Sequence, residues 1–242
     1  MKKTLPFLFL FSLVVFFVSC KKDKTPPADI PNTGTVLSTS LAGFGSYGGV
    51  PSGTPYVFPS NIKLVGEILG GNPGKSPFIG KKSIEAWQSY ISNSPKSNWV
   101  THGLGEFVTL YMRLYNTSGN ASTFVFPAGL MFTNKCPGDT TIIDTTQTGI
   151  IVIPDTVTVP GGDTLDLCLK SYCCNPHRGV PNATTVYTAK AVSNNDQIVH
   201  FIAALKGKTT LVSHESDILT YVWSIANGVP LTAADYATIA AW

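Results

Sequence analysis

The feature that most constrains the fold of this chain is a series of short segments between residues 106 and 174 in which apolar and polar side chains alternate. Residues 106–115, 156–160 and 164–174 have apolar side chains at nearly every second position. A period of two is typical of a β-strand that is buried on one face. Clusters of Gly, Pro, Asn and Asp separate these segments, as turns between strands require.

The same stretch predicts how the strands are connected. Residues 116–120 have turn chemistry, and residues 122–133 form a further apolar segment that is interrupted at Pro127. We expect segments 106–115 and 122–133 to pair as a hairpin with a kink near its far end. Several short strands with turns between them indicate an antiparallel, Ig-like β-sandwich.

Helices are predicted after the strands. Residues 194–206 and 214–227 show helical spacing of apolar side chains and end at Gly207 and Gly228. Ser213 is the expected N-cap of the second helix, and Thr232 with Asp235 resembles a capping box that starts a third. A further short helix is expected at residues 83–91. The predicted fold class is therefore α+β, with a β-sandwich over residues 61–175 and a small C-terminal helical segment over residues 193–242.

The overall composition excludes two classes of protein. Charged residues make up 13% of the 242 residues, and hydrophobic residues make up 43%. Soluble domains usually contain about 25% charged residues, so charge-driven disorder is excluded for the chain as a whole. A formal net charge of +3 is also too weak for nucleic-acid binding through a basic field.

The N-terminus has the pattern of a secretory signal peptide. Lys2 and Lys3 precede an almost wholly apolar run that ends near Val18. This run is shorter than the roughly 20 residues that a membrane-spanning helix needs. We therefore expect residues 1–19 to be a signal peptide that is removed, rather than a membrane anchor.

The residues that follow resemble a bacterial lipobox, in which a Cys ends the apolar run behind small or apolar residues. The motif here is Phe17-Val18-Ser19-Cys20, and the continuation to Lys24 is similar to lipoproteins of the Bacteroidota. The resemblance implies cleavage before Cys20 and attachment of a diacylglycerol and a further acyl chain, such as palmitate, to that residue. Several acyl chains anchor a protein stably in a membrane. An outer-membrane lipoprotein of the cell envelope is expected, and its periplasmic or surface orientation stays open.

A Gly- and Pro-rich segment connects the expected anchor to the domain. Residues 20–40 are interpreted as the lipidated Cys and a flexible spacer, and residues 41–60 as a lead segment. The lead segment contains aromatic side chains at Phe44, Tyr47, Tyr56 and Phe58. We expect these aromatics to pack on a single globular domain formed by residues 61–242.

Four cysteines remain after Cys20: Cys136, Cys168, Cys173 and Cys174. Exported proteins meet an oxidising environment, so a disulfide is the default expectation. A bond between Cys173 and Cys174 would be strained. Cys168 and Cys173 lie about 16 Å apart along an extended strand, far beyond the reach of a disulfide. Cys136 paired with one of the later three is the expected disulfide, and its partner is not determined.

The alternative for the same residues is a metal site. Cys168, Cys173, Cys174 and His177 place three thiols and an imidazole within ten positions, and zinc or Cu(I) accepts such ligands. The spacing contains no compact CxxC pair, and adjacent strand residues point to opposite faces. No cofactor is therefore predicted, and these four residues stay weak metal candidates.

No catalytic constellation is found. Ser213, His214 and Glu215 carry the residue types of a hydrolase triad, but consecutive residues cannot make its mutual hydrogen bonds. No nucleophile elbow, phosphate loop or zinc-protease motif is present. The chain is therefore not expected to be an enzyme.

A second, looser resemblance covers residues 159–228. Cys173 or Cys174 at the end of a strand, followed by a helix containing Trp223, is similar to the thioester domains of bacterial surface adhesins. In that family a Cys and a Gln form an internal thioester. Leu219 occupies the place of the Gln, so the resemblance implies at most the fold and not the activity.

The leading hypothesis for function is a lipid-anchored envelope protein with a non-enzymatic role in adhesion, binding or assembly. Its partners would be the membrane, through the N-terminal lipid, and an unknown protein or glycan, with no nucleic acid. One alternative is an envelope metal-binding protein or enzyme that uses the cluster from Cys168 to His177. Another is a structural subunit of an outer-membrane complex.

Overall fold

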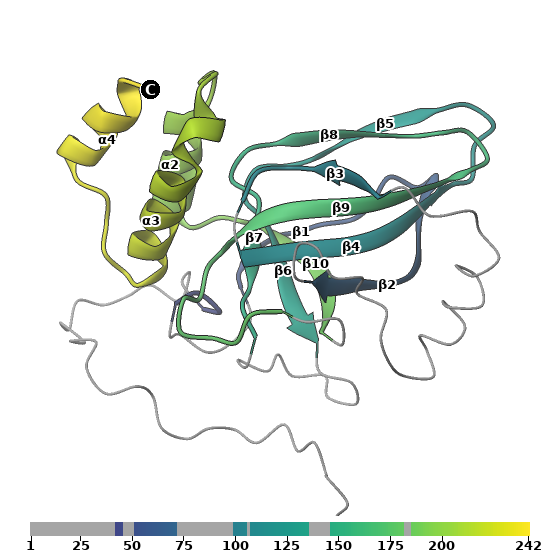
Figure 1. Cartoon of the computed structure of the whole chain (residues 1–242), viewed down its shortest axis with the longest axis horizontal. Coiled ribbons are helices and arrows are strands. Elements are labelled where there is room, and N and C mark those ends of the chain that lie inside the picture. The colour runs from purple at the N-terminus through teal and green to yellow at the C-terminus, as the bar shows by residue number, and fades with distance from the viewer. Residues whose placement is uncertain (1–41, 46–50, 72–98, 106, 136–145, 182–184) are drawn as a thin grey trace, which may run out of the picture.

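The computed structural model describes residues 42–45, 51–71, 99–105, 107–135, 146–181 and 185–242. These residues form mostly antiparallel β-structure followed by three short α-helices, so the predicted α+β class is confirmed (Figure 1). The strands are β1 (Gly53–Pro55), β2 (Ile62–Gly71), β3 (Val100–His102), β4 (Phe107–Asn116), β5 (Ser122–Phe126), β6 (Leu130–Lys135), β7 (Gly149–Ile150), β8 (Asp155–Val159), β9 (Thr164–Cys173) and β10 (Val186–Ser193).

Six of these strands close into a barrel, in the order β10-β2-β4-β9-β7-β6 and back to β10. The closing strand is β10, in which Val186 pairs with Leu69 on one side and with Lys135 on the other. The two edges of the sheet therefore meet through one strand. The Ig-like sandwich expected from the strand pattern is not what the pairing forms, because alternation predicts strands and not which edges join.

The expected hairpin between residues 106–115 and 122–133 is also wrong. Residues 122–133 divide at Pro127, and the two halves, β5 and β6, join different sheets. Strand β4 has β2 on one side and β9 on the other, so no edge of β4 is left for β5. Strand β5 instead pairs with β8, and together they form a separate two-stranded ribbon beside the barrel (Figure 1).

Strand β10 falls in residues 175–193, which were predicted to be a loop. Its pairing with β6 shifts register between Ala189 and Ala191, so its polar and apolar side chains do not keep a strict alternation. Strand β2 has a similar irregularity between Val65 and Leu69. Bulged strands such as these give a weak period-two signal, which explains why the pattern missed them.

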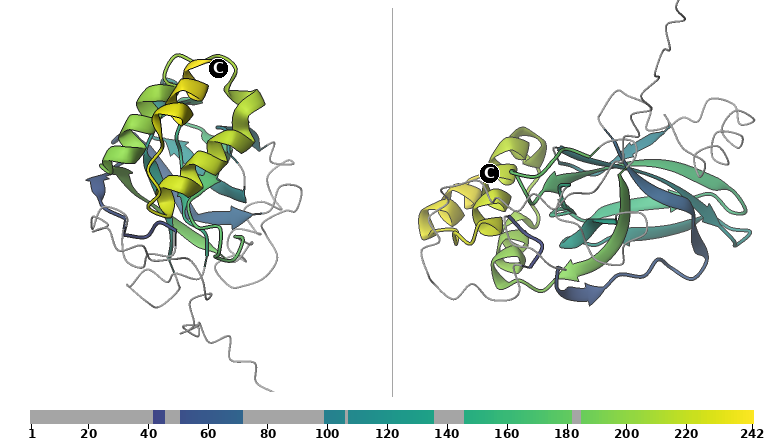
Figure 2. Two further views of the ribbon diagram at one scale, coloured as in Figure 1. Left: turned by 90° about the vertical axis from the view of Figure 1, so that its left-hand side faces the viewer. Right: turned by 90° about the horizontal axis from the view of Figure 1, so that it is seen from below.

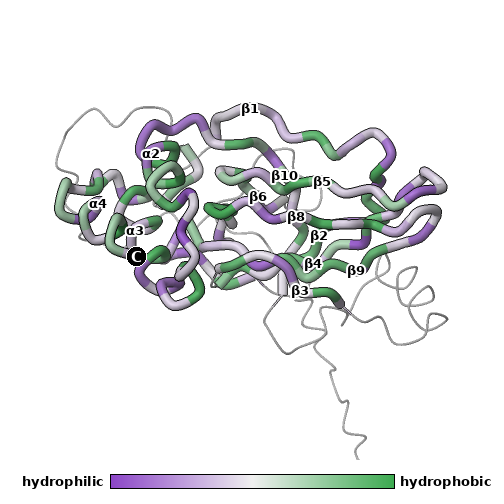
Figure 3. Tube along the Cα trace, turned by 90° about the horizontal axis from the view of Figure 1, so that it is seen from above, coloured by the Kyte–Doolittle hydropathy of each residue, from purple (hydrophilic) through white to green (hydrophobic). Residues whose placement is uncertain are grey.

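The core lies inside the barrel and beneath the ribbon. The apolar face predicted for β4 is fully buried, including Leu110 and Met112. Beneath the ribbon, Phe124 and Phe126 have ring centroids 5.1 Å apart, and Tyr56 and Phe58 of the lead segment join them. Figure 3 colours the Cα trace by hydropathy and shows apolar residues, in green, along the strands and in the helices.

The lead segment docks on the domain, as predicted. Phe44 is fully buried in the main core, and β1 pairs with the C-terminal end of β10, at Ala191, Val192 and Ser193. Tyr47 lies outside the described residues, as does the helix expected at residues 83–91. The aromatic side chains that the structure describes here therefore serve packing.

The helices α2 (Asp196–Leu205), α3 (Glu215–Ala226) and α4 (Ala233–Ala240) gather at one end of the barrel (Figure 2). The capping box of Thr232 and Asp235 is confirmed. The prediction for Ser213 is wrong, because it lies in the 3₁₀ turn η2 (Leu211–His214), where its Oγ donates to the carbonyl of Thr210. His214 is the N-cap residue of α3 and makes no side-chain capping bond.

Candidate functional site

The three cysteines that the structure describes are free and buried: Cys168, Cys173 and Cys174. No two of them form a disulfide with each other. Cys136 and Cys20 lie outside the described residues, so the lipidation of Cys20 stays a prediction. None of the three described cysteines shows the expected disulfide to Cys136, because each of them is free.

The four weak metal candidates do not gather at one point. Cys168 lies in the middle of β9, opposite Tyr111 of β4 and Thr101 of β3. Cys173 lies at the end of β9 and is fully buried, as is Cys174, whereas His177 is exposed. Across the described parts of the chain, no group of three His, Cys, Asp or Glu side chains is placed to hold a metal ion.

Burial also sets the chemistry of the two adjacent thiols. Loss of hydration raises the pKa of Cys173 to about 11 and that of Cys174 well above its ordinary value. The backbone N–H of Asn175 opposes this shift by donating to the Cys173 sulfur at 3.2 Å. The Trp223 indole N–H has a smaller effect, since it does not reach the geometry of a full hydrogen bond. Because the thiolate is the nucleophile and the metal ligand, these buried thiols are poor at both roles at neutral pH.

The residues that carry the resemblance to thioester domains are neighbours in space. Helix α3 packs against β9, and the indole N–H of Trp223 faces the Cys173 thiol. Leu219 is buried in the same core, where a thioester would need a Gln amide. The strand and helix are therefore placed together without the group that the family's chemistry requires.

Ser213, His214 and Glu215 make separate contacts at the start of α3. His214 Nδ1 lies 3.0 Å from Asp217 Oδ2, and the His214 ring stacks on Trp242 at 4.3 Å between centroids. Glu215 lies in the first turn of α3, where an acidic side chain is favoured by the helix dipole. These three residues thus serve the helix terminus and form no triad.

Asn175 is the centre of a buried polar junction at the end of β9. Its Nδ2 donates to the carbonyls of Gly43 (3.0 Å) and Gly45 (2.8 Å), and its Oδ1 accepts from the Thr148 N–H at 2.8 Å. The Gly45 N–H donates to the carbonyl of Cys174 at 2.8 Å. One fully buried amide therefore joins the lead segment to the barrel.

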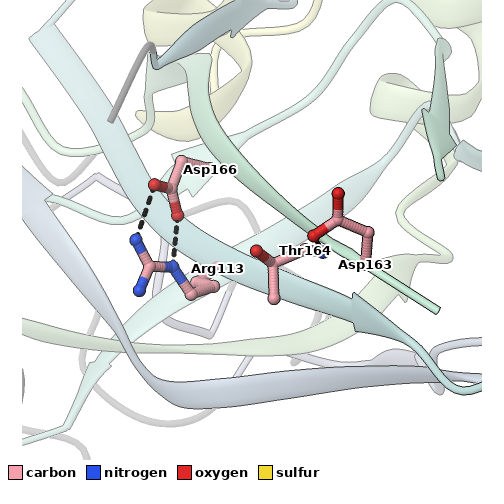
Figure 4. A network of polar contacts seen from close by, with 4 residues as sticks. All are labelled: Arg113, Asp163, Thr164 and Asp166. Atoms are coloured by element: carbon pink, nitrogen blue, oxygen red, sulfur yellow. Dashed lines mark hydrogen bonds and ion pairs between the residues drawn. The ribbon is translucent and has the colours of Figure 1, made fainter. Parts of the chain in front are cut away.

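A second polar contact joins two barrel strands. Arg113 on β4 forms a bidentate ion pair with Asp166 on β9, with Nη2 lying 2.6 Å from Oδ2 (Figure 4). Arg113 is 2% exposed and the Asp166 side chain 11% exposed. Beside them, the Asp163 carboxylate accepts from the Thr164 N–H in the turn before β9. Because the pair bridges paired strands of the sheet, it is a structural contact.

The exposed face of the β5–β8 ribbon differs from both of these sites. Its outward side chains are Thr123, Val125, Thr156 and Thr158, and the inward ones are buried. Residues 116–134 and 156–162 contain no charged residue. Among the described residues, neither outer edge of the ribbon pairs with another strand. Sequence reasoning missed this surface, although the absence of charge over residues 116–134 was a visible signal.

Comparison of the chain with protein-family models, curated proteins and solved structures finds no match. In the part of the chain that the structure describes, no helix has the length and apolar character needed to cross a membrane. The two candidate sites are therefore defined by local geometry: the buried junction at Asn175 and the uncharged ribbon.

Proposed function

We propose that this chain is a lipid-anchored cell-envelope protein whose domain binds another protein, in adhesion or in assembly, without catalysing a reaction. The anchor is supported by the lipobox ending at Cys20 and the spacer that follows it. The binding role is supported by the uncharged ribbon of β5 and β8.

The observation that carries the binding role is the outer face and edges of this ribbon. Exposed strand edges present unpaired N–H and C=O groups to solvent, and proteins commonly protect them with Lys, Pro or bulges. Neither strand of this ribbon contains a charged residue except Asp155 at one end, and their pairing has no bulge. Such an edge suits the addition of an extended strand from a partner, with the Thr and Val side chains contributing specificity.

The rival role, a metal carrier or enzyme built on residues 168–177, has less support. The raised pKa values of Cys173 and Cys174 keep both thiols protonated at neutral pH. His177 is exposed, and among the described residues it joins no group of three side chains that could hold a metal ion. These features favour packing over chemistry at this position.

A glycan is the second candidate ligand, and Phe107 is the observation that favours it. Phe107 is 46% exposed, has a φ of 73° and lies 5.9 Å from Trp223 between ring centroids. A non-glycine residue at positive φ is strained, and such strain is often found at binding sites. Exposed aromatic rings stack on the apolar faces of sugars. Loss of glycan-array binding in Phe107→Ala, with ribbon variants unaffected, would select this candidate over a protein partner.

The protein-binding role is tested by photo-crosslinking in intact cells. A photoreactive amino acid at position 125 should crosslink to one protein, identified by mass spectrometry, whereas the same group at position 199 should not. Val199 is the matched control for Val125, because the two side chains are 46% and 48% exposed. Thr158→Lys, which places a charge on the ribbon, should remove the crosslink. Equal crosslinking at both positions, or no effect of Thr158→Lys, would contradict the proposal.

The anchor is tested separately by metabolic labelling with a palmitate analogue. Labelled protein should be found in the membrane fraction for the natural chain and lost for Cys20→Ser. Cys168→Ser is the control, because it removes a buried thiol and leaves the lipobox unchanged. Retention of label in Cys20→Ser would refute lipidation at this residue.

A further inference from the structure

The lead segment meets the domain at a short turn, residues 42–45, that lies against three separate elements. Its backbone bonds to Asn175 and Cys174 at the end of β9. Thr148, next to β7, approaches the carbonyl of Gly43 with its Oγ1 at 3.5 Å. Gly45 also lies against the C-terminal end of α3. The turn therefore packs between the end of the barrel and helix α3.

The fit of this turn is tight at Gly45. The residue has a φ of 53°, and a Cβ there would lie 2.3 Å from the carbonyl oxygen of Ala226 and 2.8 Å from Oδ1 of Asn227. Only glycine satisfies both the backbone conformation and this close approach. One residue earlier, Phe44 is fully buried in the core that also contains Cys173 and Cys174. The turn is thus held by one buried side chain and by the hydrogen bonds of Asn175.

The same asparagine also contacts the thiol pair. The Asn175 N–H donates to the Cys173 sulfur, while the Asn175 side chain holds the turn. The Cys174 carbonyl accepts from Gly45, and the Cys174 N–H donates to the Thr148 carbonyl at 2.9 Å. Movement of the turn would therefore disturb Asn175, which contacts the Cys173 sulfur, and the backbone bonds of Cys174. Cys168 lies elsewhere on β9, opposite Tyr111 and Thr101.

We propose that residues 42–45 form a latch that seals Cys173 and Cys174, and that release of this latch converts two unreactive buried thiols into an exposed, reactive vicinal pair. The chain on the N-terminal side of the latch leads to the expected lipid anchor. Force applied through the anchor would act on residues 42–45 before it reached the strands of the barrel. This source of release rests on the proposed function. The latch itself rests on the contacts of residues 43–45 described above and not on the anchor.

The test is pulsed alkylation of the full chain with N-ethylmaleimide, read cysteine by cysteine through peptide mass mapping. Asn175→Ala removes both side-chain bonds to the turn, and we expect alkylation of Cys173 and Cys174 to become at least about tenfold faster. Cys168 should change by less than about twofold, because it lies outside the latch. Unchanged rates at Cys173 and Cys174 would overturn the proposal.

A second variant keeps the test decisive if Asn175→Ala unfolds the domain. Gly45→Ala displaces the turn by steric clash and leaves Asn175 in place, and it should also expose the pair selectively. Gly207→Ala is the matched control, since Gly207 has a φ of 81° and no atom within 4 Å of an added Cβ. If Cys168 reacts as fast as Cys173 and Cys174 in both variants, the turn unfolds with the whole domain and there is no latch.

The same measurement on the Cys20→Ser chain separates the two proposals. Selective alkylation should be identical with and without this substitution, because the contacts of the latch do not involve Cys20. A chain that fails to become lipidated but shows selective alkylation would remove the anchor and keep the latch. A lipidated chain that shows no selective alkylation would support the anchor and rule out the latch.

Discussion

The β5–β8 ribbon and the junction around Asn175 differ in how their polar groups are solvated. On the ribbon, Thr123 and Thr158 bond to each other across the strands and are exposed to water. At the junction, the Asn175 amide is fully buried and every one of its polar atoms has a partner. A buried polar group costs free energy when a partner is lost, whereas an exposed one bonds to water instead. The polar contacts of the junction therefore contribute to stability, whereas those on the outer face of the ribbon can be exchanged for water at little cost.

The largest expected effect is a difference in stability between substitutions on the inner and outer faces of the ribbon. Phe126→Ala should lower the free energy of unfolding by about 3–5 kcal/mol, because the ring is fully buried and contacts Tyr56, Phe58, Phe124 and Phe132. Val125→Ala, one residue earlier on the exposed face, should change it by less than about 0.5 kcal/mol. Urea unfolding of both variants measures the difference. A similar loss of unfolding free energy in both variants would show that the outer face of the ribbon is also packed.

An intermediate effect is expected from alkaline pH at the junction. Burial raises the pKa of Cys173 from 9.0 to about 11, so the unfolded chain loses this proton at lower pH than the folded chain. The stability that protonated Cys173 contributes is complete below pH 9 and is lost as pH rises toward 11. The slope is roughly 1.4 kcal/mol per pH unit for one thiol. Cys173→Ala should lower the slope of urea-unfolding stability against pH in this window by the contribution of one thiol, leaving that of Cys174, whose pKa is also raised. Val125→Ala should leave the slope unchanged.

The smallest expected effect concerns α4, at the far end of the helical segment. Bonds from the Thr232 hydroxyl and N–H lower the pKa of the exposed Asp235 carboxyl below 3.8. Its contribution to capping is therefore present above pH 3.8 and is lost as pH falls through the lowered value. After correction for the intrinsic pH dependence of exchange, amide protection in α4 should fall slightly at acidic pH, and Asp235→Asn should remove that change. Acid-induced exchange that is equal in α4 and α2 would instead indicate general unfolding.

Much of the local structure could be predicted because its signals are local. The sequences of strands β4, β8 and β9 alternate, although residues 108–114 of β4 are buried on both faces. The N-terminal ends of α2 and α4 carry Asn195 and Thr232 as caps. The missed strands, β2 and β10, carry register shifts that break the period. The site at Asn175 was missed for a different reason. Its partners, Gly43 and Gly45, are separated from it by 132 and 130 residues, and no spacing rule connects residues so far apart.

The sequence by itself determined most of the extended segments, the three C-terminal helices and the caps at Asn195 and Thr232, since these depend on the periodicity and side chains of neighbouring residues. Only the tertiary structure decided which strand edges meet. Closure through β10 turned an expected sandwich into a barrel, and the position of β4 between β2 and β9 excluded β5 from the sheet. The same packing buried Cys173 and Cys174, which in sequence were metal candidates, because solvation and pKa are set by everything that surrounds a group.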